Sequence, residues 1–209
     1  YGGADRAQTL DLFRGMVERD LRKKWFCQAS INVADDSEVL DWAARAGCKM
    51  IFLGIEAEDA EALGAVNKRL NAKRGTDAYA EIFSRIHAAG IAVLGAFIFG
   101  IDGDTPEKLL RRAEYIVHSD VDVVQMTAMT PLPGTRLFQQ LEREGRLRYT
   151  NFPEDWDRYN LTEVVFEPRD MSAHEFTHAM RACLDRVYDL KVLKAKAKRA
   201  LAATGQWDA

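Results

Sequence analysis

The stretch KMIFLGIE, residues 49–56, is a nearly continuous apolar run that ends on a carboxylate. Its length suits a β-strand, and apolar residues at consecutive positions indicate that both faces of the strand are covered. A second such run, IAVLGAFIF at residues 91–99, follows a helical pattern that stops at Gly90. Buried strands separated by helical sequence predict a parallel sheet whose strands are joined by crossover helices.

The same alternation continues on both sides of these two runs. Toward the N-terminus, residues 5–24 show the spacing of an amphipathic helix, and residues 25–33 read as a short strand. Toward the C-terminus, Thr105 and Pro106 are typical of a helix start, and residues 121–129 read as a fourth strand. We therefore predict an α/β fold with four parallel strands, as half of a barrel or as an open sheet.

The regular pattern fades after the fourth strand. Residues 149–166 form an irregular aromatic stretch, and the capping box Ser172-x-x-Glu175 opens a helix that we expect to run to about Leu201.

Composition excludes several classes of protein. The chain has 209 residues, of which 47% are hydrophobic and 29% charged, as expected of a globular domain with its own core. A net charge of -3 gives no electrostatic footprint for nucleic acid. No apolar run approaches the roughly 20 residues of a membrane span. Three widely spaced cysteines argue against a disulfide framework and favour a reducing, cytoplasmic setting.

Candidate ligand-binding residues lie where the predicted strands end, because parallel α/β proteins bind ligands beyond the carboxyl ends of their strands. This criterion selects Gln28, Ser30, Asn32, Glu56, Gly95, Gly100, Asp102, Gln125, Thr127 and Thr130.

Glu56 is the most informative of these residues. A carboxylate that ends an apolar strand accepts hydrogen bonds from an amine or a sugar hydroxyl, but it is equally well explained as a structural partner of Lys68. Lys68, next to Asn67, would meet a ligand carboxylate if its segment returns over the strand ends, and otherwise it is a surface lysine. Gly95 and Gly100 fit either a close ligand or tight helix packing.

No other motif predicts a specific chemistry. The loop from Pro131 to Thr135 reads as a turn, although its backbone could contact a flat heterocycle. His174 and His178 are spaced for chelation but lack a third ligand, so we predict no metal site. The sequence contains no Ser-His-Asp arrangement, P-loop or dinucleotide-binding glycine motif.

Five segments, taken in order, resemble the second half of a radical S-adenosylmethionine enzyme. They are WFCQASINVADD (25–36), GCKMIFLGIEAED (47–59), the Asn67-Lys68 pair, AGIAVLGAFIFGIDGDT (89–105) and TPLPGTRLFQQLEREGR (130–146). The resemblance covers residues 1–170 and is greatest to the cobalamin-binding branch, which includes hopanoid-biosynthesis enzymes and magnesium-protoporphyrin ester cyclases.

The resemblance implies a partial (βα) TIM-like barrel that holds strands three to six of six. Residues 1–146 would form this partial barrel, and residues 147–209 an aromatic segment and a C-terminal helical extension.

The resemblance also implies where S-adenosylmethionine binds. Glu56 and Lys68 would hold its ribose or methionyl part, and Gln28 and Ser30 would face the same cavity. The backbone from Gly95 to Gly100 would pass under the adenosyl group. The backbone around Met129 and Pro131 would meet the adenine.

The family's chemistry is the reductive cleavage of S-adenosylmethionine to a 5'-deoxyadenosyl radical by a [4Fe-4S] cluster. A CxxxCxxC loop holds that cluster, and this sequence has none. We therefore expect a fragment, beginning at Tyr1 and inactive alone, of an oxidoreductase or methyltransferase. The parent enzyme would act on an unactivated small-molecule substrate, with a reductant and, in this branch, cobalamin.

Without the first two strands of such a barrel, residues 25–33 would form an unpaired edge, and we expect self-association there. An aldolase-like TIM-barrel fragment and a non-catalytic ligand-binding half-barrel remain alternatives. Borohydride trapping of a Schiff base would identify the former, and an upstream reading frame without CxxxCxxC would favour the latter.

Overall fold

The computed structural model describes residues 5–58, 60–65 and 69–205 and contains a four-stranded parallel sheet in the order β1-β2-β3-β4. The elements are α1 (Arg6–Glu18), β1 (Trp25–Ala29), η1 (Ile31–Asp35), α2 (Ser37–Arg45), β2 (Cys48–Glu56), α3 (Ala60–Ala65), α4 (Arg69–Arg74), η2 (Thr76–Ala78), α5 (Tyr79–Ala88), β3 (Ala92–Phe99), α6 (Pro106–His118), β4 (Val123–Ala128), α7 (Arg136–Arg143), η3 (Glu154–Arg158), α8 (Ala173–Val187) and α9 (Leu190–Thr204). The predicted α/β architecture with four parallel strands is confirmed.

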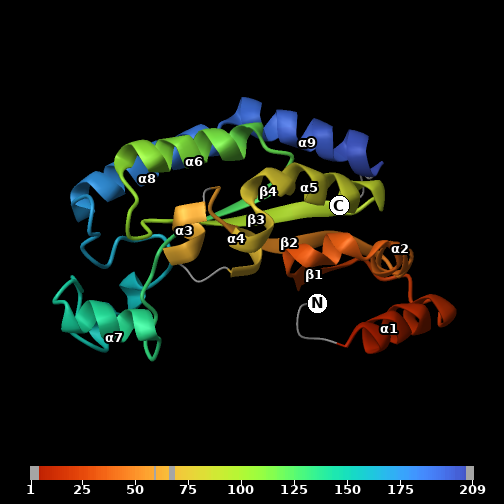
Figure 1. Ribbon diagram of the computed structural model, residues 1–209, viewed down its shortest axis with the longest axis horizontal. Helices are drawn as coiled ribbons and strands as arrows, with labels where there is room; N and C mark the ends of the chain where they lie inside the picture. The colour runs from red at the N-terminus through yellow and green to blue at the C-terminus, as the bar shows by residue number, and fades with distance from the viewer. Residues whose placement is uncertain (1–4, 59, 66–68, 206–209) are drawn as a thin grey trace.

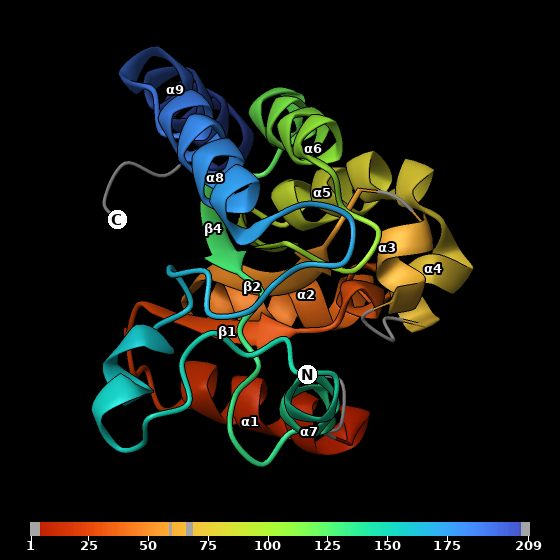
Figure 2. The ribbon, with the colours of Figure 1, turned by 90° about the vertical axis from the view of Figure 1, so that its left-hand side faces the viewer.

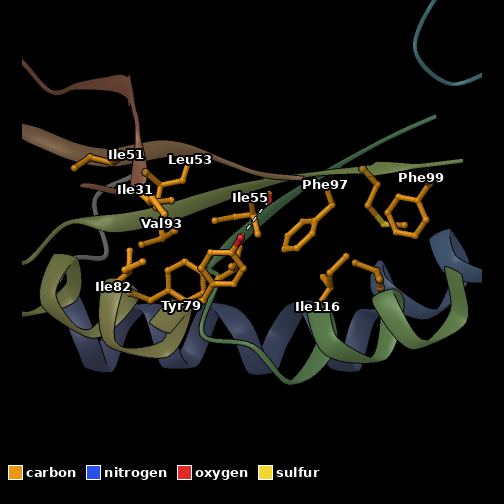
Figure 3. Packing of buried hydrophobic residues seen from close by; sticks show 14 of the residues in the cluster. Ile31, Ile51, Leu53, Ile55, Tyr79, Ile82, Val93, Phe97, Phe99 and Ile116 are labelled. Carbon is orange, nitrogen blue, oxygen red and sulfur yellow. Dashed lines mark hydrogen bonds between the residues drawn. The ribbon is translucent and has the colours of Figure 1, made fainter. Parts of the chain in front are cut away.

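The two faces of the sheet are covered to different extents. Figures 1 and 2 show α5, α6, α8 and α9 on one side of the sheet, with α1 and α7 on the other. Ile51, Val93 and Phe97 pack beneath α5 and α6 and are fully buried or nearly so (Figure 3). The alternate residues of the strands face away from these helices, and at the sheet edges they are exposed: Phe26 to 68% and Val123 to 41%.

Helix ends follow from local capping chemistry. The Thr105 side chain accepts from the Lys108 amide, with Pro106 at the first turn, as the sequence predicted. The capping box of Ser172 and Glu175 is also formed.

The prediction of one long C-terminal helix is wrong. α8 ends at Val187, and Asp189 caps a second helix by accepting from the amides of Lys191 and Val192. A good N-cap in mid-pattern therefore breaks the helix into two.

The predicted first strand is also too long. β1 ends at Ala29, and residues from Ile31 to Asp35 form a 3₁₀ helix. Ile31 and Val33 are buried in that helix, so apolar residues at alternate positions here mark packing rather than strand pairing.

The two edges of the sheet differ. At β4, the Ala128 amide donates to the Leu161 carbonyl at 2.8 Å, and the Tyr188 hydroxyl donates to the Val124 carbonyl at 3.0 Å. Leu161, in the aromatic segment, and Tyr188, at the end of α8, are thus hydrogen-bonded to outward-facing backbone groups of β4. At β1, no strand among the described residues pairs with the outer side.

Lys196 fastens α9 to the rest of the fold. It is only 2% exposed, and its ammonium donates to the carbonyls of Ser119 at 3.0 Å and Val121 at 2.8 Å. Burial, with a smaller contribution from Arg199, lowers the pKa of Lys196 to about 8 despite the opposing charges of Asp122 and Asp120. A neutral amine keeps two N–H donors, so both hydrogen bonds survive deprotonation.

We expect this lysine to make the protein more stable in mildly alkaline solution. Between pH 8 and 10.5 the unfolded lysine holds a proton that the folded one has lost, so the free energy of unfolding rises with pH, by about 3 kcal/mol. Urea denaturation at several pH values measures this rise. The variant Lys196→Met should lack this contribution, and equal pH profiles for both proteins would contradict the assignment.

Among the described residues no helix combines the length and apolarity needed to cross a membrane.

Candidate functional site

The carboxyl ends of β2, β3 and β4 come together in space. Ala57, which follows β2, and Ile101, which follows β3, belong to one small buried cluster against which Met129 packs. The Met129 amide also donates to the Phe99 carbonyl at 2.7 Å. The structure thus assembles the edge of the sheet at which parallel α/β proteins bind their ligands.

Glu56 ends β2 in an unusual backbone conformation. Its φ angle is 68°, in the left-handed region, and the Ala57 amide donates to the Ile55 carbonyl at 2.9 Å across it. These two features define a γ-turn of the rare, strained kind centred on Glu56. The β2–β3 register also shifts between Gly54 and Glu56. Such bulges and strained residues concentrate at functional sites, where they redirect a side chain.

Two buried side chains hold the backbone just before this turn. The Asn71 amide nitrogen lies 3.1 Å from the Gly54 carbonyl oxygen, 3.3 Å from that of Ile55 and 3.2 Å from the Tyr79 hydroxyl. The Tyr79 hydroxyl in turn donates to the Ile55 carbonyl at 3.4 Å. Burial, together with the charges of Glu56 and Glu58, raises the pKa of Tyr79 to about 12, so its hydroxyl remains a donor.

Arg112 ties the end of β2 to the loop after β3. It is fully buried, and its guanidinium donates twice to the Asp104 carboxylate, both at 2.9 Å, and once to Glu58 at 2.7 Å. Asp104 also accepts from the amides of Gly100 and Ile101, both at 3.0 Å. One buried arginine therefore fixes two neighbouring strand ends.

The sequence is similar to those of known proteins, although no protein-family model matches the chain. The chain is 31% identical over 208 residues to the hopanoid C-2 methylase of Rhodopseudomonas palustris, covering 97% of this chain and 38% of the relative. It is 28% identical over 166 residues to the bacteriochlorophyllide d C-12(1)-methyltransferase of Chlorobaculum tepidum, covering 79% of this chain and 34% of the relative.

The fold has a solved counterpart in the radical S-adenosylmethionine methyltransferase TsrM of Kitasatospora setae, a structure with cobalamin and a [4Fe-4S] cluster bound. The TM-score is 0.60 at 18% identity, over 89% of this chain and 41% of TsrM. The chain belongs to the radical S-adenosylmethionine superfamily. It spans little more than a third of the length of these two curated relatives.

The resemblance predicts the S-adenosylmethionine site at strand ends, and the structure puts several of the predicted residues there. Glu56 ends β2, and Ser30 directly follows β1 and is half-buried. Met129 is half-buried beside the ends of β2 and β3, and Pro131, two residues on, is buried. Their contacts with the cofactor stay predictions.

Gln28 lies farther back than these residues. It is an exposed residue within β1, opposite Phe52 and on the face away from the helices. Lys68 and Asn67 lie outside the described residues.

The two candidate glycines are explained by packing. A Cβ at Gly95 would lie 3.0 Å from the Val121 side chain, on the covered face of the sheet. At Gly100, where φ is 87°, a Cβ would lie 2.3 Å from the ring of Phe176 on α8. Of the two explanations left open by the sequence, the structure therefore favours tight packing at both glycines, against a loop residue at Gly95 and against a helix at Gly100. A backbone contact with the adenosyl group remains a prediction.

The side chains of the site suit S-adenosylmethionine but not a [4Fe-4S] cluster. A largely buried carboxylate at a strand end matches ribose hydroxyls or an ammonium group. For the cluster, no group of three or more His, Cys, Asp or Glu that could hold a metal ion occurs among the described residues. Cys48 and Cys183 are also fully buried. The described residues therefore do not fit the cluster.

Sequence reasoning missed Asn71, Tyr79, Asp104 and Arg112. Asn71 and Tyr79 sit on helices, and Arg112 continues the charged pattern of α6, so each reads as an ordinary helical residue. The one available signal was the carboxylate of Asp104, which precedes a predicted helix start and reads as capping chemistry.

Proposed function

We propose that these residues form the S-adenosylmethionine-binding side of a radical enzyme that transfers a methyl group to an unactivated carbon. Methyl transfer is favoured because the two relatives described above are named as methylating enzymes, while magnesium-protoporphyrin IX monomethyl ester cyclases match the chain at lower identity. The observation that carries the proposal is the strained, buried Glu56 at the assembled strand ends.

In this proposal the chain binds and orients the cofactor. Glu56 would accept hydrogen bonds from the ribose hydroxyls or the methionyl ammonium, with Lys68 on the ligand carboxylate and Ser30 and Gln28 on the same side. Bound S-adenosylmethionine, with a cluster, a reductant and cobalamin, supplies the radical and methyl-transfer chemistry. Residues 1–146 form the partial barrel, and residues 147–209 are an extension that supports it.

The substrate of this enzyme is expected to be a largely apolar small molecule. Phe26, Phe52, Leu94 and Val123 face away from the covering helices, on one face of a sheet in which Glu56 ends a strand. An apolar wall of this kind favours an apolar substrate over a charged one.

We expect Glu56→Gln to weaken S-adenosylmethionine binding by about tenfold or more, because a charge-assisted hydrogen bond is lost. The measurement is the dissociation constant under anaerobic conditions in the complete natural protein that contains these residues, followed by an assay for 5'-deoxyadenosine. Glu61→Gln is the control, because the Glu61 side chain is 76% exposed on α3. Unchanged affinity in Glu56→Gln, or no binding by the wild-type protein, would overturn the proposal.

We also propose that the 209-residue chain associates with itself through β1. The strand is at the sheet edge, its outer side has no strand partner among the described residues, and Phe26 on it is 68% exposed. Sedimentation analysis should show a dimer that Phe26→Lys disrupts. Leu12→Lys, on the exposed face of α1, is the matched control. A monomeric wild-type chain would refute the proposal.

A further inference from the structure

Glu56 is held in its left-handed conformation by groups outside its own strand. An L-residue other than glycine in this region costs roughly 1–2 kcal/mol and persists only where its surroundings determine it. The surroundings are supplied by Asn71 on α4 and Tyr79 on α5, which lie eight residues apart and converge on the same two carbonyl groups.

The hydrogen bonds act on the peptides that precede the turn. In a regular strand the carbonyls of Gly54 and Ile55 would be paired along the sheet, but the register shift disturbs the β2–β3 pairing at this point. Asn71 bonds to both carbonyls, and Tyr79 adds a bond to Ile55, as the dashed line in Figure 3 shows. Without these side chains the Gly54 carbonyl would lose its side-chain donor and the Ile55 carbonyl would keep only the Ala57 amide, which would draw the strand end back toward the sheet.

Both side chains are enclosed in the protein interior. Asn71 is 3% exposed and Tyr79 is fully buried, and the two are hydrogen-bonded to each other at 3.2 Å. The Tyr79 ring lies 6.1 Å from that of Phe83, stacked within the core beneath the sheet. The pair therefore transmits the position of α4 and α5 to the end of β2.

We propose that Asn71 and Tyr79 are positioning residues that fix the Glu56 turn and thereby set the affinity for S-adenosylmethionine. The inference rests on the proposed function of Glu56. It assigns to α4 and α5 a role in cofactor binding that acts through the backbone at the end of β2.

A double-mutant cycle tests this assignment in the complete natural protein, with S-adenosylmethionine affinity as the readout. Asn71→Leu should weaken binding about fivefold to tenfold, and Tyr79→Phe, which keeps the ring, about threefold. In a Glu56→Gln background neither change should weaken binding by more than about twofold. A merely structural role would weaken binding equally in both backgrounds and would overturn the assignment.

Tyr159→Phe serves as the matched control. Its hydroxyl is likewise in a buried residue and donates to a backbone carbonyl, that of Tyr149 at 2.7 Å, but away from β2. Its affinity should stay within about twofold of the wild type. A loss in Tyr159→Phe as large as that in Tyr79→Phe would overturn the assignment, because the effect would then be general.

A second measurement does not depend on the ligand. The Cα and Cβ chemical shifts of Glu56 in the labelled protein report its φ angle, and they should move from left-handed to extended values in Asn71→Leu. Unchanged shifts in both Asn71→Leu and Tyr79→Phe would overturn the inference even if Glu56→Gln impairs binding. Failure of the wild-type protein to bind S-adenosylmethionine would instead overturn the proposed function, and the inference with it.

Discussion

Arg112→Met should lower the free energy of unfolding by about 3–5 kcal/mol, because it leaves buried carboxylates without their cation. Asp104 is only 2% exposed and accepts hydrogen bonds from both terminal nitrogens of the guanidinium, while Glu58 accepts one from the remaining nitrogen. Burial opposes the charge of Arg112, but its hydrogen bonds to Asp104 and the negative charges of Asp104 and Glu58 prevail and raise its pKa. Urea denaturation at neutral pH measures the loss.

A neighbouring ion pair provides the control for that experiment. Lys108, on the same helix, lies 3.0 Å from Glu61, whose side chain is 76% exposed. Lys108→Met should therefore cost less than about 1 kcal/mol. Similar losses of unfolding free energy in the two variants would contradict the prediction, because burial of the Arg112 ion pairs would then not increase the cost of removing the cation.

Gly100→Ala should destabilise the protein by about 2–4 kcal/mol. A left-handed φ of 87° costs an L-residue roughly 1 kcal/mol, and the new methyl group would meet the Phe176 ring at 2.3 Å. Phe176 is fully buried, so its ring has no free space to move into. Thermal or urea unfolding measures the difference.

Gly134→Ala isolates the backbone cost from the steric cost. Its φ is 79°, and nothing lies within 4 Å of the Cβ position, so a loss of about 1 kcal/mol is expected. In a Phe176→Leu background the cost of Gly100→Ala should fall toward the same value. Equal costs at both glycines in the wild-type background would contradict the packing explanation.

The strands were predictable from the sequence because parallel strands covered by helices need long apolar runs. Residues 49–56 and 91–99 each coincide with an observed strand to within one residue at either end. The alternation of these runs with amphipathic helices then leaves few topologies to consider. The position of Glu56 at a strand end follows directly from the same pattern.

Interactions between distant segments were not predictable in this way. Arg112 reads as part of a solvated helix face, yet its partner Glu58 is 54 residues away along the chain. Asn71 likewise meets Gly54 only after α4 folds back over β2. Neither periodicity nor capping rules contain information about such partners. The same limit applies to Gly100, where the ring of a phenylalanine on α8 leaves no space for a side chain.

The occupied edge of β4 limits how many copies of this chain can combine. A sheet with two open edges adds neighbours indefinitely and grows into a fibre, whereas here Leu161 and Tyr188 already engage the outward groups of β4. Each molecule has a valency of one for strand pairing. In the proposed association, a two-fold contact between two β1 strands would use up both edges, and growth would end at a closed pair.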